Sequence, residues 1–273
     1  MIGTIAGDLI GSAYEFSRLK TKGFQPLFHP KARFTDDTVC TVAVADALLN
    51  NSEPQGTMIR WCNDYAENGG WGRQFALWFL SDNPQPYGSW GNGAAMRVSP
   101  VGLLAKDERE VLLWSDQFST LTHDHPEAMA SAQAVALAIY WAKCGEPMQA
   151  IKKKLVDRYC YNLDRTPDDI RPNYVRTERA IDSVPQAISC AIYANGFEDA
   201  VRNAVSLGGD SDTIAAIAGG IAEAAFGVPD DIRAETFGRL PKDIQSVVSR
   251  FYECYSTTEK VTNQGPSVLS SNA

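Results

Sequence analysis

Positively charged residues are in the minority in this 273-residue sequence, with 25 Lys and Arg against 33 Asp and Glu and a formal net charge of −8. Binding of nucleic acid through its phosphates requires a basic face, so we expect no such partner. A phosphate-bearing small ligand is not excluded, because backbone amides and bound cations can neutralise a phosphate. Apolar runs of about 18 residues or more are also absent, so we expect no membrane span.

Paired cysteine motifs are missing as well. None of the six cysteines forms a C-x-x-C pair, and most lie in apolar stretches. We therefore expect buried thiols in a reducing compartment rather than disulfides or a zinc site. The N-terminus has Asp8 early and no basic segment, which argues against a secretory signal and predicts a cytoplasmic protein. Ser99 lacks the G-x-S-x-G pattern, which argues against a serine hydrolase.

Helical patterns dominate the chain, and convincing alternating strands are absent. Five stretches have apolar residues at helical spacing, several with Gly or Pro at their ends: 37–50, 125–145, 184–196, 211–227 and 241–255. Two stretches rich in Gly, Pro or polar residues interrupt them. Residues 81–100 predict a loop that leads into a short helix, and residues 163–174 predict a surface excursion.

These patterns predict an all-α fold, a compact multi-helix single domain. We expect the domain to span residues 1–258. The polar composition of the remaining segment, 259–273, is typical of a disordered tail.

Two similar acidic clusters stand at the starts of predicted helices. The sequence TDDT (35–38) precedes an Ala- and Val-rich helix, and DSDT (210–213) precedes an Ala- and Gly-rich one. Helix capping explains one acid in each cluster well and two acids less well. Helices of small residues can approach closely, so the clusters could converge, and about two divalent cations would then balance the four carboxylates. Ligands that are all oxygen favour Mg²⁺ or Mn²⁺ over zinc.

Six motifs occur in an order that resembles the ADP-ribosylglycohydrolase family. The resemblance covers roughly residues 1–230, and the motifs are GDLIGSAYE (7–15), TDDT (35–38), GSWGNGAAMRVSPVGL (88–103), LTHDHPEA (121–128), DSVPQAI (182–188) and GGDSDTIAAIAGGI (208–221). The resemblance implies an all-α fold with two Mg²⁺ or Mn²⁺ ions. It also implies cleavage of the bond between the anomeric ribose carbon of ADP-ribose and an acceptor.

The resemblance also implies roles for the acidic clusters. The implied metal ligands are Thr35, Asp36, Asp37, Asp210, Asp212 and Thr213, with Asp36 and Asp212 expected to be essential for turnover. Glu15 matches an acid near the metal centre that touches the substrate ribose or a metal-bound water. Without the resemblance, Glu15 is typical of an ordinary charged residue on an exposed face.

The glycine-rich segment GSWGNG (88–93) offers consecutive backbone N–H groups that permit close approach of an anion. It has neither the Walker spacing nor a preceding strand, so a plain turn is the alternative. The resemblance implies that this loop holds the diphosphate and distal ribose through Ser89, Trp90, Gly91, Asn92 and Gly93.

Three histidines are present, and only His123 receives a predicted role. On its own it is typical of a capping or core imidazole, and the resemblance implies that it contacts ADP-ribose. His29 and His125 are left unassigned.

The sequence as a whole predicts a metal-dependent hydrolase that removes ADP-ribose from an acceptor, with a modified protein arginine as the first expectation. Water assisted by Glu15 or a neighbouring Asp would attack the anomeric carbon through an oxocarbenium-like state. The base, the acceptor and the oligomeric state are left open, and we expect the acceptor pocket in loops 16–34 and 63–74.

Two alternative functions remain open. One is a non-catalytic ADP-ribose-binding or structural protein of crystallin type on the same scaffold. The other is a metal-dependent phosphohydrolase that cleaves the diphosphate and releases AMP.

Overall fold

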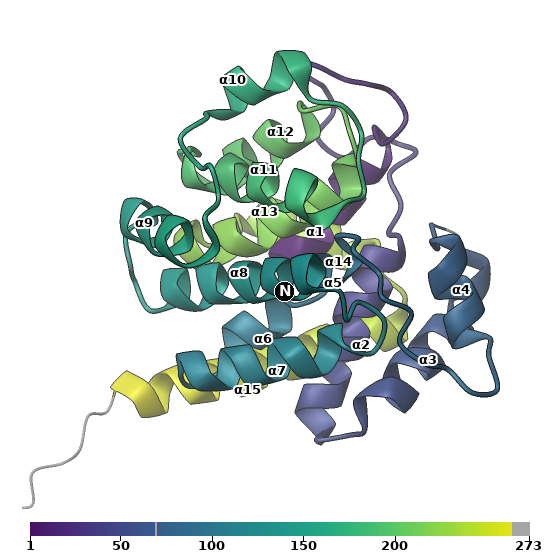
Figure 1. The fold of residues 1–273 in the computed structure, drawn as a ribbon. Coiled ribbons are helices and arrows are strands. Elements are labelled where there is room, and N and C mark those ends of the chain that lie inside the picture. Colours follow the sequence, from purple (N-terminus) through teal and green to yellow (C-terminus); the bar gives the residue numbers. More distant parts are fainter. Residues whose placement is uncertain (69, 264–273) are drawn as a thin grey trace, which may run out of the picture.

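Helices make up the regular structure of the part of the chain that the computed structural model describes, residues 1–68 and 70–263 (Figure 1). In that part the β-structure is limited to one isolated bridge between Gly91 and Arg179. The predicted all-α class is therefore confirmed. In chain order the helices are α1 (Ile2–Ser12), α2 (Asp36–Asn50), α3 (Pro54–Asp64), α4 (Arg73–Phe79), α5 (Gly93–Met96), α6 (Ser99–Leu104), α7 (Glu108–Ser119), α8 (Pro126–Lys143), α9 (Met148–Tyr159), α10 (Pro167–Ile170), α11 (Ala180–Ile192), α12 (Phe197–Val205), α13 (Ser211–Phe226), α14 (Asp230–Gly238) and α15 (Lys242–Asn263), with 3₁₀ turns at Ala66–Asn68 and Arg171–Asn173.

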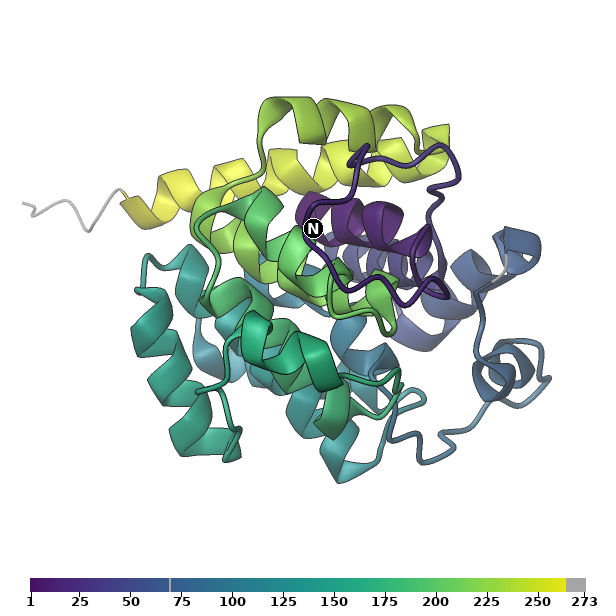
Figure 2. The same ribbon diagram turned by 90° about the horizontal axis from the view of Figure 1, so that it is seen from above.

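The centre of the fold is a close antiparallel pair formed by α1 and α13, which lie side by side in Figures 1 and 2. A Cβ atom on Gly7 would lie 2.0 Å from the Ala215 carbonyl oxygen, and one on Gly11 would lie 2.3 Å from the Ser211 carbonyl oxygen. Only glycine permits this backbone contact. As a result, the end of α1 lies directly against the start of α13.

Helix α2 begins beside the same end of α1, because Asp8 caps it. One carboxylate oxygen of Asp8 accepts hydrogen bonds from the backbone N–H groups of Thr35 (2.9 Å) and Thr38 (3.1 Å). These N–H groups have no partner within the helix, and a carboxylate is the favoured acceptor there. The starts of α2 and α13 therefore meet around the end of α1.

The remaining helices surround this centre and bury it. Helix α13 also packs against α8, α11 and α12, whereas α2 packs against α3 and α15. Helix α8 in turn contacts α5, α6, α7, α9, α11 and α13, so it is apolar on most sides. This burial explains why its Ala-rich sequence lacks a clear polar stripe.

The five helices expected from the sequence are all present, with some boundaries shifted. The stretch 184–196 corresponds to α11, which begins earlier, at Ala180, and contains Pro185 in its interior. Helix α15 runs on to Asn263, past the expected end of the domain at residue 258. The expected tail, 259–273, thus begins inside a helix, and its residues 264–273 lie outside the described residues.

Two other expectations were wrong. The segment 163–174 is not simply a surface excursion, because Leu163 and Ile170 are buried and the segment includes α10. The cysteines were expected to be buried, but only half of them are. Cys40, Cys62 and Cys190 lie in the core, whereas the exposed ones are Cys144, Cys160 and Cys254. Among the described residues, no helix combines the length and apolar character needed to cross a membrane.

Candidate functional site

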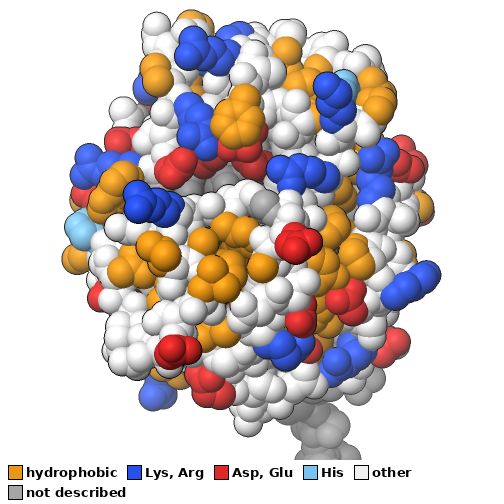
Figure 3. Space-filling model, turned by 90° about the vertical axis from the view of Figure 1, so that its right-hand side faces the viewer, with side chains coloured by type: hydrophobic (Ala, Val, Ile, Leu, Met, Phe, Trp, Pro, Cys, Tyr) orange, Lys and Arg blue, Asp and Glu red, His pale blue; other side chains and the backbone are white. Residues whose placement is uncertain are grey.

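A cavity of about 570 Å³ opens where the starts of α2 and α13 meet. Figure 3 shows Asp and Glu side chains gathered beside a hollow on one face of the molecule, with Lys and Arg side chains around it. All the site residues predicted from the sequence line this cavity except Thr35: Glu15, Asp36, Asp37, Ser89, Trp90, Gly91, Asn92, Gly93, His123, Asp210, Asp212 and Thr213. Thr35 does not line the cavity, and its hydroxyl is 2.9 Å from Asp8 Oδ1.

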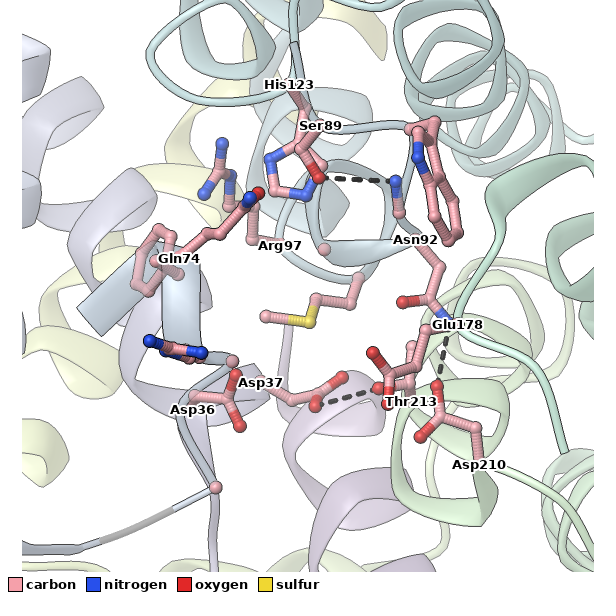
Figure 4. A pocket seen from close by; sticks show the side chains of 18 of the residues that line it. Asp36, Asp37, Gln74, Ser89, Asn92, Arg97, His123, Glu178, Asp210 and Thr213 are labelled. Atoms are coloured by element: carbon pink, nitrogen blue, oxygen red, sulfur yellow. Dashed lines mark hydrogen bonds between the residues drawn. The ribbon is translucent and has the colours of Figure 1, made fainter. Parts of the chain in front are cut away.

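The two acidic clusters form one end of the cavity (Figure 4). Thr213 Oγ1, on α13, donates a 3.1 Å hydrogen bond to Asp37 Oδ2, on α2. The predicted convergence of the two clusters is therefore confirmed. The roles of these residues as ligands stay a prediction.

Two sets of carboxylates could each hold a cation, and Asp212 belongs to both. The first set is Asp8, Asp37 and Asp212, and the second is Glu15, Asp210 and Asp212. Within each set, one oxygen from every residue lies within 4.8 Å of the others. Asp36 lines the cavity beside the first set but belongs to neither. A carboxylate shared by two such sets is able to bridge a pair of neighbouring ions.

The hydrogen bonds separate Asp8 from Asp37 in role. Asp8 Oδ2 accepts from the Thr38 hydroxyl (2.5 Å) as well as from two backbone N–H groups, so its lone pairs are already used. By contrast, the buried Oδ1 of Asp37 has no hydrogen-bond partner among the described residues. A buried carboxylate oxygen without a donor is costly. Asp37 is therefore the better candidate to bind a cation, whereas Asp8 holds the start of α2 against α1.

Burial and mutual repulsion both disfavour the charged forms of these acids. Burial raises the pKa of Asp8 and of Asp210 to about 6, and for Asp210 the hydrogen bond from Asn92 and the charge of Arg176 oppose this rise. The pKa of Asp37 is well above its ordinary value, first through burial and then through the charges of Asp8 and Asp212. Divalent cations would relieve this repulsion, and hard oxygen ligands suit Mg²⁺ or Mn²⁺, so the residues present fit the expected ions.

Glu15 is held at the cavity mouth by Arg176, which sequence reasoning missed. Arg176 Nη2 lies 2.7 Å from Glu15 Oε1 and 3.6 Å from Asp210 Oδ1, and Arg176 Nη1 lies 3.0 Å from Glu178 Oε1. The guanidinium also lies over the ring of Phe16, with 5.4 Å between its carbon and the ring centroid. Three carboxylates therefore surround one guanidinium beside the second candidate cation set.

The glycine-rich loop lines the cavity and is hydrogen-bonded to its neighbours. Asn92 N donates to the Glu178 carbonyl (2.8 Å), and Ala180 N donates to the Trp90 carbonyl (3.0 Å). Asn92 Nδ2 also donates to Asp210 Oδ2 (2.8 Å) and so links the loop to the start of α13. Trp90 stands at the rim with 52% of its surface exposed, so its ring is available to stack on a ligand.

The glycine-rich loop was expected to offer consecutive backbone N–H groups to an anion, but four of its six N–H groups already donate within the protein. The N–H groups of Gly88, Ser89, Gly91 and Asn92 all donate within the protein, to Asp124 Oδ1, the Thr122 carbonyl, Ser89 Oγ and the Glu178 carbonyl. The glycines were expected to let an anion approach, but most of the backbone N–H groups here are already paired. An anion in the cavity must therefore find part of its hydrogen bonds elsewhere.

His123 lies beside this loop and is 5% exposed. A Cβ atom on Gly93 would lie 2.9 Å from His123 Nε2, so glycine at 93 leaves room for the imidazole. Burial, together with the charge of Arg97, lowers the pKa of His123 well below its ordinary value. Burial therefore favours the neutral form of the ring. His125, left unassigned, caps α8 by accepting a hydrogen bond from Glu127 N (3.2 Å).

Several lining residues were not singled out individually from the sequence: Gly70, Gly72, Arg73, Gln74, Phe75, Tyr87, Met96, Arg97, Arg176 and Glu178. The expected acceptor loop 63–74 contributes the first four, but among the described residues none of loop 16–34 lines the cavity. The only available signal for Arg176 was its place in a charged, Pro-flanked stretch. Asp8 could have been noticed as an acid inside an otherwise apolar helix.

Comparisons with known proteins identify the family of the chain. The sequence model of the ADP-ribosylglycohydrolase family matches residues 1–260, so the chain belongs to this family. The expected family and its enzyme class, a glycosidic-bond hydrolase, are confirmed. A solved structure described as an ADP-ribosylglycohydrolase-related protein complex has the same fold, with a TM-score of 0.68 at 22% identity over 93% of this chain and 95% of that one.

Three curated relatives have sequences similar to that of this chain. ADP-ribosylhydrolase ARH3 of Danio rerio is 26% identical over 305 residues, which cover 84% of this chain and 82% of the relative. ADP-ribosylarginine hydrolase Tri1 of Serratia proteamaculans is 26% identical over 267 residues, which cover 83% and 70%. ADP-ribosyl-[dinitrogen reductase] glycohydrolase of Rhodospirillum rubrum is 23% identical over 283 residues, which cover 91% of each chain.

Proposed function

We propose that this protein removes ADP-ribose from an ADP-ribosylated protein by hydrolysing the glycosidic bond at the anomeric ribose carbon. The observation that carries the proposal is the pair of carboxylate sets that share Asp212 at one end of a cavity. Family membership and the names of the relatives support the choice of ADP-ribose. The pocket is large enough for a ligand of nucleotide size.

Two divalent cations, Mg²⁺ or Mn²⁺, are proposed to complete the site. Their proposed ligands come from both acidic clusters and are Thr35, Asp36, Asp37, Asp210, Asp212 and Thr213. When bound, such ions neutralise the carboxylates, orient ribose hydroxyls and activate water for attack. The unpartnered Asp37 Oδ1 and the two carboxylate sets support the roles of Asp37, Asp210 and Asp212.

The residues of the chain place the rest of the substrate. The 88–93 loop and His123, which line the cavity, are proposed to hold the diphosphate, with the exposed ring of Trp90 beside it. Arg176 directs Glu15 toward Asp210 and Asp212. In that position Glu15 is suited to orient the attacking water or accept its proton as the bond to the acceptor breaks.

A protein arginine is the acceptor that we propose. Glu15, Glu178 and Asp210 already surround a guanidinium, that of Arg176, at the cavity mouth beside the second cation set. Carboxylates in this arrangement recognise guanidinium groups by charge-assisted hydrogen bonds. The name of the Serratia relative, an ADP-ribosylarginine hydrolase, points to the same acceptor.

The test is a product assay on an ADP-ribosyl-arginine protein with Mg²⁺ or Mn²⁺. We expect free ADP-ribose, and we expect Asp212→Ala to lose most of this release. Asp231→Ala is the matched control, because Asp231 also lies in the first turn of a helix but is exposed and away from the cavity. Binding without release would favour the non-catalytic rival, and AMP as product would favour a phosphohydrolase. A parallel panel of serine- and nucleobase-linked substrates tests the acceptor.

A further inference from the structure

The surroundings of His123 define which of its ring nitrogens carries the proton. His123 Nδ1 lies 2.7 Å from Thr122 Oγ1, and both groups are buried. The other nitrogen, Nε2, faces the glycine-rich loop at Gly93, on the side where the cavity lies. A neutral imidazole has one donor and one acceptor nitrogen, so the contact at Nδ1 decides what Nε2 can do.

Arg97 determines which group donates the hydrogen in the contact between Thr122 Oγ1 and His123 Nδ1. Its side chain is fully buried, and its Nη2 donates to Thr122 Oγ1 (2.9 Å) and to the Phe118 carbonyl (2.8 Å). A guanidinium can only donate, so the Thr122 oxygen must accept from Arg97. The Thr122 hydroxyl retains one hydrogen. Among the described residues, its remaining side-chain hydrogen-bond partner is His123 Nδ1.

The hydroxyl hydrogen therefore belongs on the Nδ1 side. If Nδ1 carried the proton instead, the Thr122 hydroxyl hydrogen would be buried without an acceptor, which is unfavourable. A doubly protonated ring would place a second positive charge beside Arg97 in a buried site. Figure 4 shows Arg97 and His123 together on the side of the cavity opposite Asp36 and Asp210.

We propose that Arg97 and Thr122 are positioning residues that fix His123 as the neutral Nε2–H tautomer, so that Nε2–H donates to an anionic ligand in the cavity. The proposal rests on the proposed function in one respect, that the anion is the diphosphate of ADP-ribose. Four backbone N–H groups of the glycine-rich loop already donate within the protein. The Nε2–H group of His123 is therefore an important donor for the anion. The Thr122 carbonyl also accepts one of these hydrogen bonds, from Ser89 N (3.3 Å). Thr122 therefore positions both the His123 ring and the glycine-rich loop.

The experiment compares Thr122→Val, which removes the hydroxyl at nearly constant shape, with Thr122→Ser, which keeps it. Long-range ¹H–¹⁵N correlation spectra of histidine-labelled protein at pH 7 report the tautomer of His123, assigned with a His123→Gln variant. We expect the Nε2–H tautomer in the wild type and in Thr122→Ser, and a mixture or the other tautomer in Thr122→Val. Melting temperatures check that both variants fold.

Binding of ADP-ribose, measured by calorimetry, is the second readout. We expect Thr122→Val to weaken binding at least tenfold and Thr122→Ser to restore it. An Nδ1–H tautomer or a charged ring in the wild type would overturn the proposal, as would unchanged affinity in Thr122→Val. A protein that shows the expected tautomer and binding but releases no ADP-ribose from its substrate would contradict the hydrolase function and support this inference.

Discussion

The hydroxyl of Thr213 donates a 3.1 Å hydrogen bond to the carboxylate of Asp37, although the two residues are 176 positions apart in the chain. This contact joins the first turns of α13 and α2. It exists because glycines in α1 allow α13 to lie against it, while Asp8 of α1 caps α2. The site therefore depends on the packing of α1 as much as on the acids themselves.

Asp212→Asn tests the shared carboxylate. Burial, then the charges of Asp210 and Glu15, raise the pKa of Asp212 well above its ordinary value, so the negative charge is unfavourable in the metal-free protein. We expect the substitution to stabilise the metal-free protein by about 0.5–2 kcal/mol and to abolish the stabilisation that Mn²⁺ gives the wild type. Thermal melts with and without Mn²⁺ measure both effects, with Asp231→Asn as control. An Asp212→Asn variant that Mn²⁺ still stabilises as it does the wild type would contradict the role of Asp212 as a metal ligand.

The pH dependence of stability provides a second test. In the folded metal-free protein, the pKa of both Asp8 and Asp210 is about 6, above the ordinary value of 3.8. Because the folded pKa is raised, the contribution of these two groups to the free energy of unfolding is fully present below pH 3.8. That contribution is lost as the pH rises through about 6. We therefore expect Mn²⁺ to raise the melting temperature more at pH 7.5 than at pH 5. Equal shifts at the two pH values would be inconsistent with buried, repelling acids.

Arg176→Gln tests the guanidinium site at the cavity mouth. Removal of the internal guanidinium leaves Glu15, Glu178 and Asp210 without their cation. We expect agmatine, a small guanidinium compound, to bind this variant several-fold more tightly than the wild type in a calorimetric titration. Arg179→Gln is the matched control, because Arg179 pairs with Glu127 and does not line the cavity. Unchanged agmatine affinity would argue against a guanidinium acceptor.

Gly7→Ala tests the contact between α1 and α13. The added methyl group would lie 2.0 Å from the Ala215 carbonyl oxygen, so the helices must separate. Overpacking of this kind costs about 1–3 kcal/mol or more, and it should also weaken Mn²⁺ binding because Asp37 and Asp212 move apart. Gly238→Ala is the control, since a Cβ atom there meets no heavy atom within 4 Å. Denaturant melts measure the loss, and equal stability of the two variants would count against the packing argument.

Local signals were sufficient to predict most of the helices and the acids of the site. The helix starts at 36 and 211 follow from capping residues and from runs of small apolar residues, which act within a few positions of the chain. Convergence of the two clusters could be inferred only as a possibility, because it requires the contact between α1 and α13. The sequence gives no local reason for that contact beyond spaced glycines.

The residues that were missed act through long-range contacts. Asp8 caps a helix that starts at residue 36, and Arg176 reaches Glu15 from a loop that is far away in sequence. Arg97 acts on His123 through Thr122, a relation that only the packed structure reveals. The incorrect expectation for the glycine-rich loop has the same origin, since the partners of its N–H groups include Asp124, Thr122 and Glu178.

The most direct test of the whole account is the anomalous diffraction of manganese in crystals of the protein grown with Mn²⁺. We predict two neighbouring peaks, one beside Asp37 and Asp212 and the other beside Asp210 and Asp212, with the Asp212 carboxylate between them. A map at millimolar Mn²⁺ with no peak between α2 and α13 would contradict the metal-dependent site and the hydrolase mechanism that rests on it.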